Sequence, residues 1–138
     1  MPAKDLFHDT VKNALVREGW IITDDPLFLQ YGGFDSYIDL GAEKIVAAEK
    51  AGQQIAVEIK SFIGKSFIYE FHQAIGQFIH YRLVLTNKEP ERMLYLAIPD
   101  DSYQAYFTLP LTTELIETYQ IKYLVYDIEQ EIIIKWQT

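Results

Sequence analysis

The sequence contains no cysteine, and this absence excludes disulfide cross-links, thiolate zinc sites, iron–sulfur clusters and a cysteine nucleophile. Long apolar runs are missing too. No stretch approaches the roughly 20 apolar residues that span a bilayer, and residues 1–20 alternate charged with apolar side chains instead of forming the apolar core of a signal peptide. We therefore expect a cytoplasmic protein without a membrane-embedded segment.

Positive charge is scarce, because 12 Lys and Arg stand against 20 Asp and Glu and the net charge is −8. This balance argues against non-specific binding of nucleic acid or anionic membranes through the whole surface. The deficit is uneven: residues 1–50 carry −4, residues 51–92 carry +1 and residues 93–138 carry −5. A polyanion is therefore expected to meet the middle of the chain, which holds five basic residues: Lys60, Lys65, Arg82, Lys88 and Arg92.

Several nucleotide-binding and hydrolytic motifs are also missing. The chain has no Gly-rich phosphate loop, dinucleotide-binding fingerprint or nucleophile elbow, which argues against ATPases and dehydrogenases. What is present is ample core material, since 49% of the 138 residues are apolar and 14% are aromatic. We predict a single domain over residues 1–138.

The first half of the chain is predicted to contain one helix and a β-hairpin. Apolar residues at helical spacing predict a helix over 4–18, followed by a strand at 20–23. The next segment, which includes the Gly32-Gly33 pair, is expected to be irregular. The hairpin is predicted from extended segments at 37–40, 44–49 and 55–60, with a polar turn at 51–54.

The second half of the chain is predicted to begin with a helix capped by Ser66. Its expected apolar face is Phe71, Ile75, Phe78 and Ile79, and its expected polar stripe is Gln73, Gln77 and Tyr81. A loop is expected over 86–92, and the apolar run at 93–98 predicts a central strand covered on both faces. The remaining predictions are a helix over 112–119 and strands at 121–127 and 131–136.

This order of elements favours an α/β or α+β fold in which helices flank a mixed β-sheet. Each amphipathic helix needs a sheet face on which to bury its apolar side. Within that fold one group of residues predicts chemistry: Asp39, and Glu58 and Lys60 in the segment Glu58-Ile59-Lys60. Residues two apart in a strand project to the same face, and the hairpin can bring Asp39 beside them.

Paired carboxylates predict a site for Mg²⁺ or Mn²⁺, with the backbone carbonyl of Ile59 as a further ligand. Lys60 would then orient a water molecule or stabilise charge on a scissile phosphate. The alternative is a solvated sheet face with a cross-strand ion pair, worth only about 0–1 kcal/mol. Likewise, Gln77 either supports Lys60 or belongs to a solvent-facing helix surface.

The positions of Asp39 and of Glu58-Ile59-Lys60 resemble the PD-(D/E)xK nuclease superfamily, which has a restriction-endonuclease-like core. The glutamine stripe of the second helix is similar to the branch that includes Holliday-junction resolvases. The resemblance implies metal-dependent hydrolysis of DNA phosphodiesters. The acid that often lies on the first helix of the superfamily has no unambiguous counterpart, and the candidates are Asp5, His8, Asp9 and Glu18. Of these, His8 is expected to be an exposed partner of Lys12 or Asp5.

A closer resemblance, to the XisH family of fdxN element excision controlling factors, covers nearly the whole chain. It rests on the segments 19–20, 23–27, 38–43, 55–62, 74–77 and 95–97. The family implies a cyanobacterial protein needed, with a XisI partner, for excising a DNA element during heterocyst differentiation.

Two hypotheses follow from this resemblance. The first is a Mg²⁺-dependent endonuclease-like protein, with Asp39, Glu58, Lys60 and Gln77 as its site, acting on branched or recombination-intermediate DNA. The second is a non-cleaving accessory protein that binds a XisI-like subunit and regulates a recombinase. We also expect a homodimer.

Overall fold

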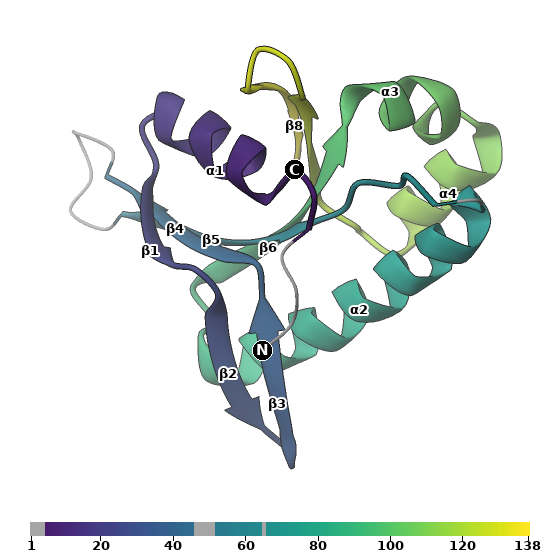
Figure 1. Cartoon of the computed structure of the whole chain (residues 1–138). Helices are drawn as coiled ribbons and strands as arrows, with labels where there is room; N and C mark the ends of the chain where they lie inside the picture. The colour runs from purple at the N-terminus through teal and green to yellow at the C-terminus, as the bar shows by residue number, and fades with distance from the viewer. Residues whose placement is uncertain (1–4, 46–51, 65) are drawn as a thin grey trace.

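A computed structural model describes residues 5–45, 52–64 and 66–138. The chain forms a six-stranded sheet in the order β1-β4-β5-β6-β7-β8, with a two-stranded hairpin, β2-β3, beside it (Figure 1). The sheet is mixed, because β5, β6 and β7 run parallel while the remaining pairs are antiparallel. The predicted mixed sheet flanked by helices is confirmed. The elements are α1 (His8–Arg17), β1 (Ile21–Asp24), β2 (Leu27–Tyr31), β3 (Phe34–Ile38), β4 (Leu40–Lys44), β5 (Gln53–Ile59), α2 (Phe67–Lys88), β6 (Arg92–Pro99), α3 (Asp100–Ser102), a π-helical turn (Tyr103–Phe107), α4 (Pro110–Thr118), β7 (Tyr123–Asp127) and β8 (Ile132–Gln137).

The helices α1 and α2 lie on opposite faces of the sheet (Figure 1). Alternate residues of β5 serve the two faces: Val57 and Ile59 are buried in the cluster that includes Val11 of α1, whereas Ala56 is buried in the cluster that includes Phe78 of α2. This alternation is the period-two geometry of a strand. It places the side chain of the intervening residue, Glu58, on the face covered by α2.

The central strand β6 confirms the prediction of a strand covered on both faces, since it lies between β5 and β7 and is buried from Leu94 to Pro99. The Ser66 cap is confirmed as well, because its side chain accepts a hydrogen bond from the Tyr69 N–H at 3.3 Å. The predicted segment 44–49 and the start of the 51–54 turn fall partly outside the described residues, but β4 and β5 do form an antiparallel pair.

Three expectations of secondary structure were wrong. The segment before Tyr37 is not irregular, because residues 27–38 form the hairpin β2-β3 around the Gly32-Gly33 turn, in which both glycines have positive φ. Residues 86–88 belong to α2 rather than to a loop. The Thr86 hydroxyl and the Asn87 amide each donate to a backbone carbonyl four residues earlier, so that both polar side chains are bonded within the helix. Finally, Ile79 lies outside the apolar face of α2 and is 44% exposed.

Candidate functional site

Asp39 is the single residue between β3 and β4, where the hairpin ends and the large sheet begins. The pairing of Leu40 with Val57 places Asp39 opposite Glu58. At these two positions, hydrogen bonds from backbone N–H groups to carboxylates extend the β4-β5 pairing. The Asp39 N–H donates to Glu58 Oε1 at 3.3 Å, and the Ile59 N–H donates to Asp39 Oδ2 at 2.7 Å. The structure therefore brings together the two carboxylates that the sequence places 19 residues apart.

Lys60 directly follows β5 and, two residues after Glu58, extends its side chain toward the Glu58 carboxylate. Its Nζ lies 3.5 Å from Glu58 Oε2 and donates a hydrogen bond to Gln77 Oε1 on α2. Its backbone is fixed on both sides: the N–H donates to the Ala97 carbonyl at 3.0 Å, and the carbonyl accepts from the Tyr126 hydroxyl at 3.0 Å. Burial raises the pKa of Tyr126, which keeps the phenol protonated as a donor. Lys60 is thus held by a rigid backbone with its ammonium toward Glu58.

The predicted polar stripe of α2 divides into separate roles. Gln77 contacts Lys60, whereas Gln73 donates to the Tyr69 hydroxyl at 3.4 Å on its own helix. Tyr81 is half-buried rather than solvent-facing. Burial raises the pKa of Tyr81 to about 12, and the negative charges of Glu58 and Asp39 add to that rise. Gln77 and Tyr81 therefore border the carboxylate pair, and Gln73 does not contact Lys60.

The electrostatics of the pair are dominated by desolvation. Glu58 is only 7% exposed, and this burial, assisted by the charge of Asp39, raises the pKa of Glu58 to about 8. Burial also raises the pKa of Asp39, although the hydrogen bond from the Ile59 N–H opposes it. Lys60 favours the charged forms of both groups but does not outweigh burial. Burial thus favours the protonated form of each carboxyl group.

A hard divalent cation fits this donor set. Two adjacent buried carboxylates supply what Mg²⁺ ordinarily takes from a protein, which is one or two carboxylates, with water and substrate oxygens as the other ligands. A cation would replace a proton at this site and relieve the repulsion between the two charges. Among residues 5–45, 52–64 and 66–138, no three His, Cys, Asp or Glu side chains form a metal-binding group. Ligation by the Ile59 carbonyl stays a prediction.

The candidates for a first-helix acid do not add a third carboxylate to the pair within the described part of the chain. Glu18 accepts hydrogen bonds from the Trp136 indole N–H at 2.9 and 3.2 Å, which ties α1 to β8. Asp5 accepts from the Phe7 N–H at 2.9 Å, before α1 begins. Asp9 is exposed, and its charge acts on Lys12.

The expectation that His8 is exposed was wrong. Its side chain is 4% exposed, and its Nε2 lies 2.6 Å from Asp25 Oδ1. Lys12, its expected partner, bonds the other oxygen of Asp25 at 2.7 Å. Burial keeps the pKa of Asp39 raised and the nearby His8 ring only partly opposes that rise, so this residue lies near the carboxylate pair without adding an acid to it.

The basic residues of the middle segment are largely occupied by the fold. Arg92 donates to the Ile55 carbonyl at 3.0 Å and pairs with Glu89 and Asp24. Arg82 donates to the Tyr119 and Gln120 carbonyls at 3.1 and 2.9 Å. Lys65 falls outside the described residues, and Lys88 is exposed on the last turn of α2.

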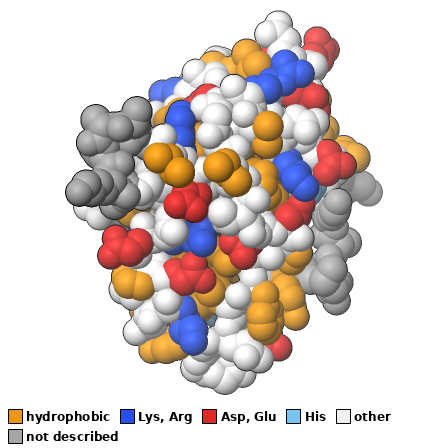
Figure 2. Space-filling model, turned by 90° about the vertical axis from the view of Figure 1, so that its left-hand side faces the viewer, with side chains coloured by type: hydrophobic (Ala, Val, Ile, Leu, Met, Phe, Trp, Pro, Cys, Tyr) orange, Lys and Arg blue, Asp and Glu red, His pale blue; other side chains and the backbone are white. Residues whose placement is uncertain are grey.

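The surface charge on one side of the molecule is mixed. Acidic and basic side chains lie next to one another there, with apolar atoms between them (Figure 2). Such a face suits specific contacts better than broad attraction of a polyanion. No helix in the described ranges is long and apolar enough to cross a bilayer.

The chain matches known proteins along almost its entire length. The family model described as XisH protein matches residues 1–134. An XisH family protein from Nostoc punctiforme PCC 73102 is 46% identical in sequence, with a TM-score of 0.89 over 97% of this chain and 100% of that one. A fdxN element excision controlling factor protein from Anabaena variabilis is 48% identical, with a TM-score of 0.88 over 98% of this chain and 100% of that one. No curated protein matches the chain.

Proposed function

Because this chain belongs to the XisH family, we propose that it acts in the excision of a DNA element, as a Mg²⁺-dependent endonuclease-like protein of the PD-(D/E)xK superfamily. The observation that carries the proposal is the contact between Asp39 and Glu58 at the end of the β4-β5 ladder, with Lys60 beside them. The substrate class we propose is branched or recombination-intermediate DNA.

The chemistry follows from the placement of each group. Asp39 and Glu58 would hold Mg²⁺, which lowers the pKa of bound water and neutralises charge on a phosphoryl oxygen. The Lys60 ammonium is positioned to orient the attacking water or to stabilise the negative charge that grows on the phosphate. Gln77 accepts a hydrogen bond from Lys60 and thereby fixes its direction. The burial of Glu58 strengthens these electrostatic interactions.

A nicking assay tests the proposal. End-labelled single-stranded, duplex and four-way-junction DNA are incubated with the chain in Mg²⁺, in Mn²⁺ and in EDTA. We expect metal-dependent cleavage that is fastest on the junction and is lost in Glu58→Gln, a variant of nearly equal shape. Cleavage that survives in Glu58→Gln, or in EDTA, contradicts the assignment.

A second candidate function, that of a non-cleaving accessory protein, is favoured by the surface of β8. This strand ends the sheet and pairs only with β7 among the described strands. Its Ile132 and Ile134 are 37% and 50% exposed, and residues 93–138 carry a net charge of −5. An open strand edge with exposed apolar side chains, in a segment of net negative charge, suits a protein partner better than DNA. The partner we propose is a XisI-like subunit.

Co-purification separates the two candidates. If the chain is an accessory protein, a tagged form retains the XisI-like subunit, Ile134→Lys abolishes that retention, Glu58→Gln leaves it unchanged, and no DNA is cut. Retention that survives Ile134→Lys contradicts the assignment to β8.

The same edge is our proposed contact for a homodimer, for which light scattering at micromolar concentration should give twice the mass of the chain.

A further inference from the structure

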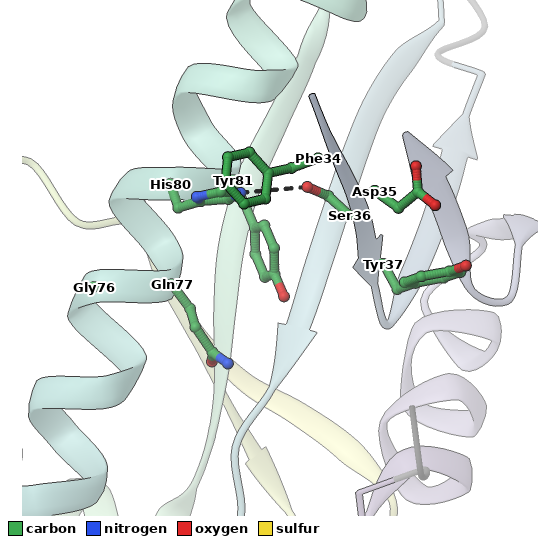
Figure 3. Close-up of a pocket in the computed structure, with 8 residues that line it drawn as sticks. All are labelled: Phe34, Asp35, Ser36, Tyr37, Gly76, Gln77, His80 and Tyr81. Atoms are coloured by element: carbon green, nitrogen blue, oxygen red, sulfur yellow. Dashed lines mark hydrogen bonds between the residues drawn. The ribbon is translucent and has the colours of Figure 1, made fainter. Parts of the chain in front are cut away.

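A cavity of about 430 Å³ borders the carboxylate site, between β3 and α2 (Figure 3). Its volume lies within the range of about 300–1,000 Å³ that is usual for small-molecule sites. Phe34 and Ser36 of β3 line one wall, and Gly76, Gln77, His80 and Tyr81 of α2 line the other. Asp35 and Tyr37 also border the cavity, but their side chains point away from α2, as the alternation along β3 requires (Figure 3).

The lining combines aromatic surface with neutral hydrogen-bonding groups. Phe34 is 67% exposed, and its ring packs edge to face against the His80 ring, with the two ring centroids 6.2 Å apart. The Tyr81 ring also packs edge to face against the His80 ring, with the centroids 5.6 Å apart. The Ser36 hydroxyl lies 3.3 Å from His80 Nε2 and fixes the imidazole (Figure 3). The described lining contains no Lys or Arg. It therefore suits a planar heterocycle that stacks and accepts or donates hydrogen bonds, and not a phosphate.

Gly76 is exposed and leaves the α2 wall of the cavity open. Glycine in the interior of a helix is less favourable than alanine, because it loses more backbone freedom on folding. At Gly76 a Cβ atom would meet nothing within 4 Å. The packing of the chain itself therefore does not require glycine there. What glycine provides is open space at the wall of the cavity, next to Gln77 (Figure 3).

The cavity and the carboxylate site are contiguous. Gln77 lines the cavity and also bonds the Lys60 ammonium. Tyr81 lines the cavity and feels the negative charges of Glu58 and Asp39. A phosphate placed at Lys60 would therefore have the base of the same or the adjacent nucleotide within reach of Phe34 and His80.

We propose that this cavity binds one unpaired nucleobase of DNA whose phosphate lies at Lys60. The inference rests on the proposed function and specifies its substrate. A base inside a duplex is stacked on both faces and paired along its edge, so that it reaches such a cavity only from single-stranded, junction or flipped DNA. The cavity would thus select DNA that contains unpaired bases, as branched and recombining DNA does.

Binding measurements without metal test the proposal. A fluorescein-labelled single strand of twelve nucleotides that contains one 2-aminopurine is titrated with the full chain in EDTA, alongside a blunt duplex of the same sequence. We expect the single strand to bind about tenfold or more tightly than the duplex, with quenching of the 2-aminopurine as it stacks. Gly76→Leu, which fills the cavity, and Phe34→Ala, which removes an exposed ring, should each weaken binding about tenfold.

The matched control is Asn87→Leu. It adds the same side chain to an exposed position of α2 eleven residues from Gly76, about 16 Å along the helix, and it should leave binding unchanged. Equal affinity for the single strand and the duplex, or undiminished binding by both Gly76→Leu and Phe34→Ala, overturns the proposal. Because no cleavage is needed, quenching that persists in a chain that cuts no DNA supports the base site while the proposed hydrolysis fails. Conversely, junction cleavage with an unchanged KM in Gly76→Leu overturns the base site alone.

Discussion

Two groups of acidic and basic side chains lie near the start of α1 and the end of β5. Burial acts to raise the carboxyl pKa in both groups, but positive partners outweigh burial in only one of them. In the Asp25 cluster, His8 and Lys12 contact the two carboxylate oxygens at 2.6 and 2.7 Å. Burial alone would raise the pKa of Asp25, but the hydrogen bonds from Lys12 and His8 outweigh it and lower the pKa.

In the Asp39–Glu58 cluster, burial prevails and raises the pKa of both carboxyl groups. Lys60, at 3.5 Å from Glu58, is the nearest positive partner that the described residues provide. Both carboxylate oxygens of Asp25 therefore have a partner within the fold, although His8 Nδ1 is buried without a hydrogen-bond partner among the described residues. In the Asp39–Glu58 cluster burial disfavours the two negative charges, so that a proton or an added cation would stabilise it, and perturbed carboxyl groups of this kind are common at functional sites.

The largest effect that separates the two clusters is on DNA cleavage. Glu58→Gln removes a proposed Mg²⁺ ligand and should reduce the rate of cleavage by about a thousandfold or more. Asp25→Asn, the matched change in the other cluster, should leave the rate within about threefold, because Asp25 is already neutralised by its partners. Single-turnover assays on junction DNA measure both rates. Equal losses in the two variants would show that the clusters do not differ in the way proposed.

A smaller effect is expected for the groups that surround the carboxylate pair. Lys60→Met keeps most of the side-chain volume but removes the charge, and it should slow cleavage by about 10²–10³-fold. Gln77→Ala should cost about tenfold, since it only loosens the direction of Lys60. Circular dichroism checks that both variants fold. If Gln77→Ala costs as much as Lys60→Met, Gln77 has a more direct role than that of a positioning residue.

The stability of the chain should depend on pH through Glu58. The folded chain holds the Glu58 proton up to about pH 8, whereas an unfolded glutamate titrates near its ordinary value of 4.5. The folded state therefore binds more protons in this window, and the free energy of unfolding falls as pH rises from about 4.5 to 8 and then levels off. Glu58→Gln removes this loss and should be more stable than the parent chain at pH 9, by on the order of 2–4 kcal/mol.

Urea denaturation in EDTA at pH 5, 7 and 9 measures this dependence. Added Mg²⁺ should restore stability to the parent chain at pH 9 and have no such effect on Glu58→Gln. A difference between the two proteins that stays constant with pH would mean that Glu58 is charged throughout.

The smallest effect is expected for the Asp25 cluster. Because the pKa of Asp25 is lowered, its charge stabilises the fold above the unfolded value near 3.8, and this contribution is lost as pH falls below it. Asp25→Asn should cost about 1 kcal/mol at pH 7, a modest figure because the Lys12 partner is 38% exposed. Thermal denaturation at pH 7 and pH 3 measures the change, which should shrink at the lower pH. A larger cost at pH 3 would contradict the account.

Much of the candidate site is predictable from local sequence. Strand periodicity alone places Glu58 and Lys60 on one face, and the antiparallel register of β4 and β5 sets Asp39 opposite Glu58. The helical spacing of α2 likewise places Gln77 on the polar stripe, where it meets Lys60. The strand relations are short-range, since each depends on the repeat of one strand or on a single hairpin, whereas the contact between Gln77 and Lys60 joins α2 to the end of β5.

The features that could not be predicted from the sequence depend on contacts between distant segments. His8 is buried because Asp25, 17 residues later and outside any repeat, accepts its hydrogen bond. The hairpin β2-β3 depends on a cross-strand register that buries Leu27, Leu29 and Ile38 against α2, and the Gly32-Gly33 pair signals a two-residue turn as readily as a break. The cavity beside the site arises from that hairpin, so that missing the hairpin also conceals the cavity.

Crystals soaked in Mn²⁺ at pH 8.5 would reveal whether the Asp39–Glu58 cluster binds a divalent cation, as we propose. A high pH favours metal binding, because carboxyl ligands must lose their protons to bind a metal. We expect an anomalous density peak within about 2.5 Å of carboxylate oxygens of both Asp39 and Glu58, absent from crystals of Glu58→Gln. A map without that peak, in which the two carboxyl groups keep their hydrogen bonds to the backbone N–H groups of Ile59 and Asp39, would contradict the proposal.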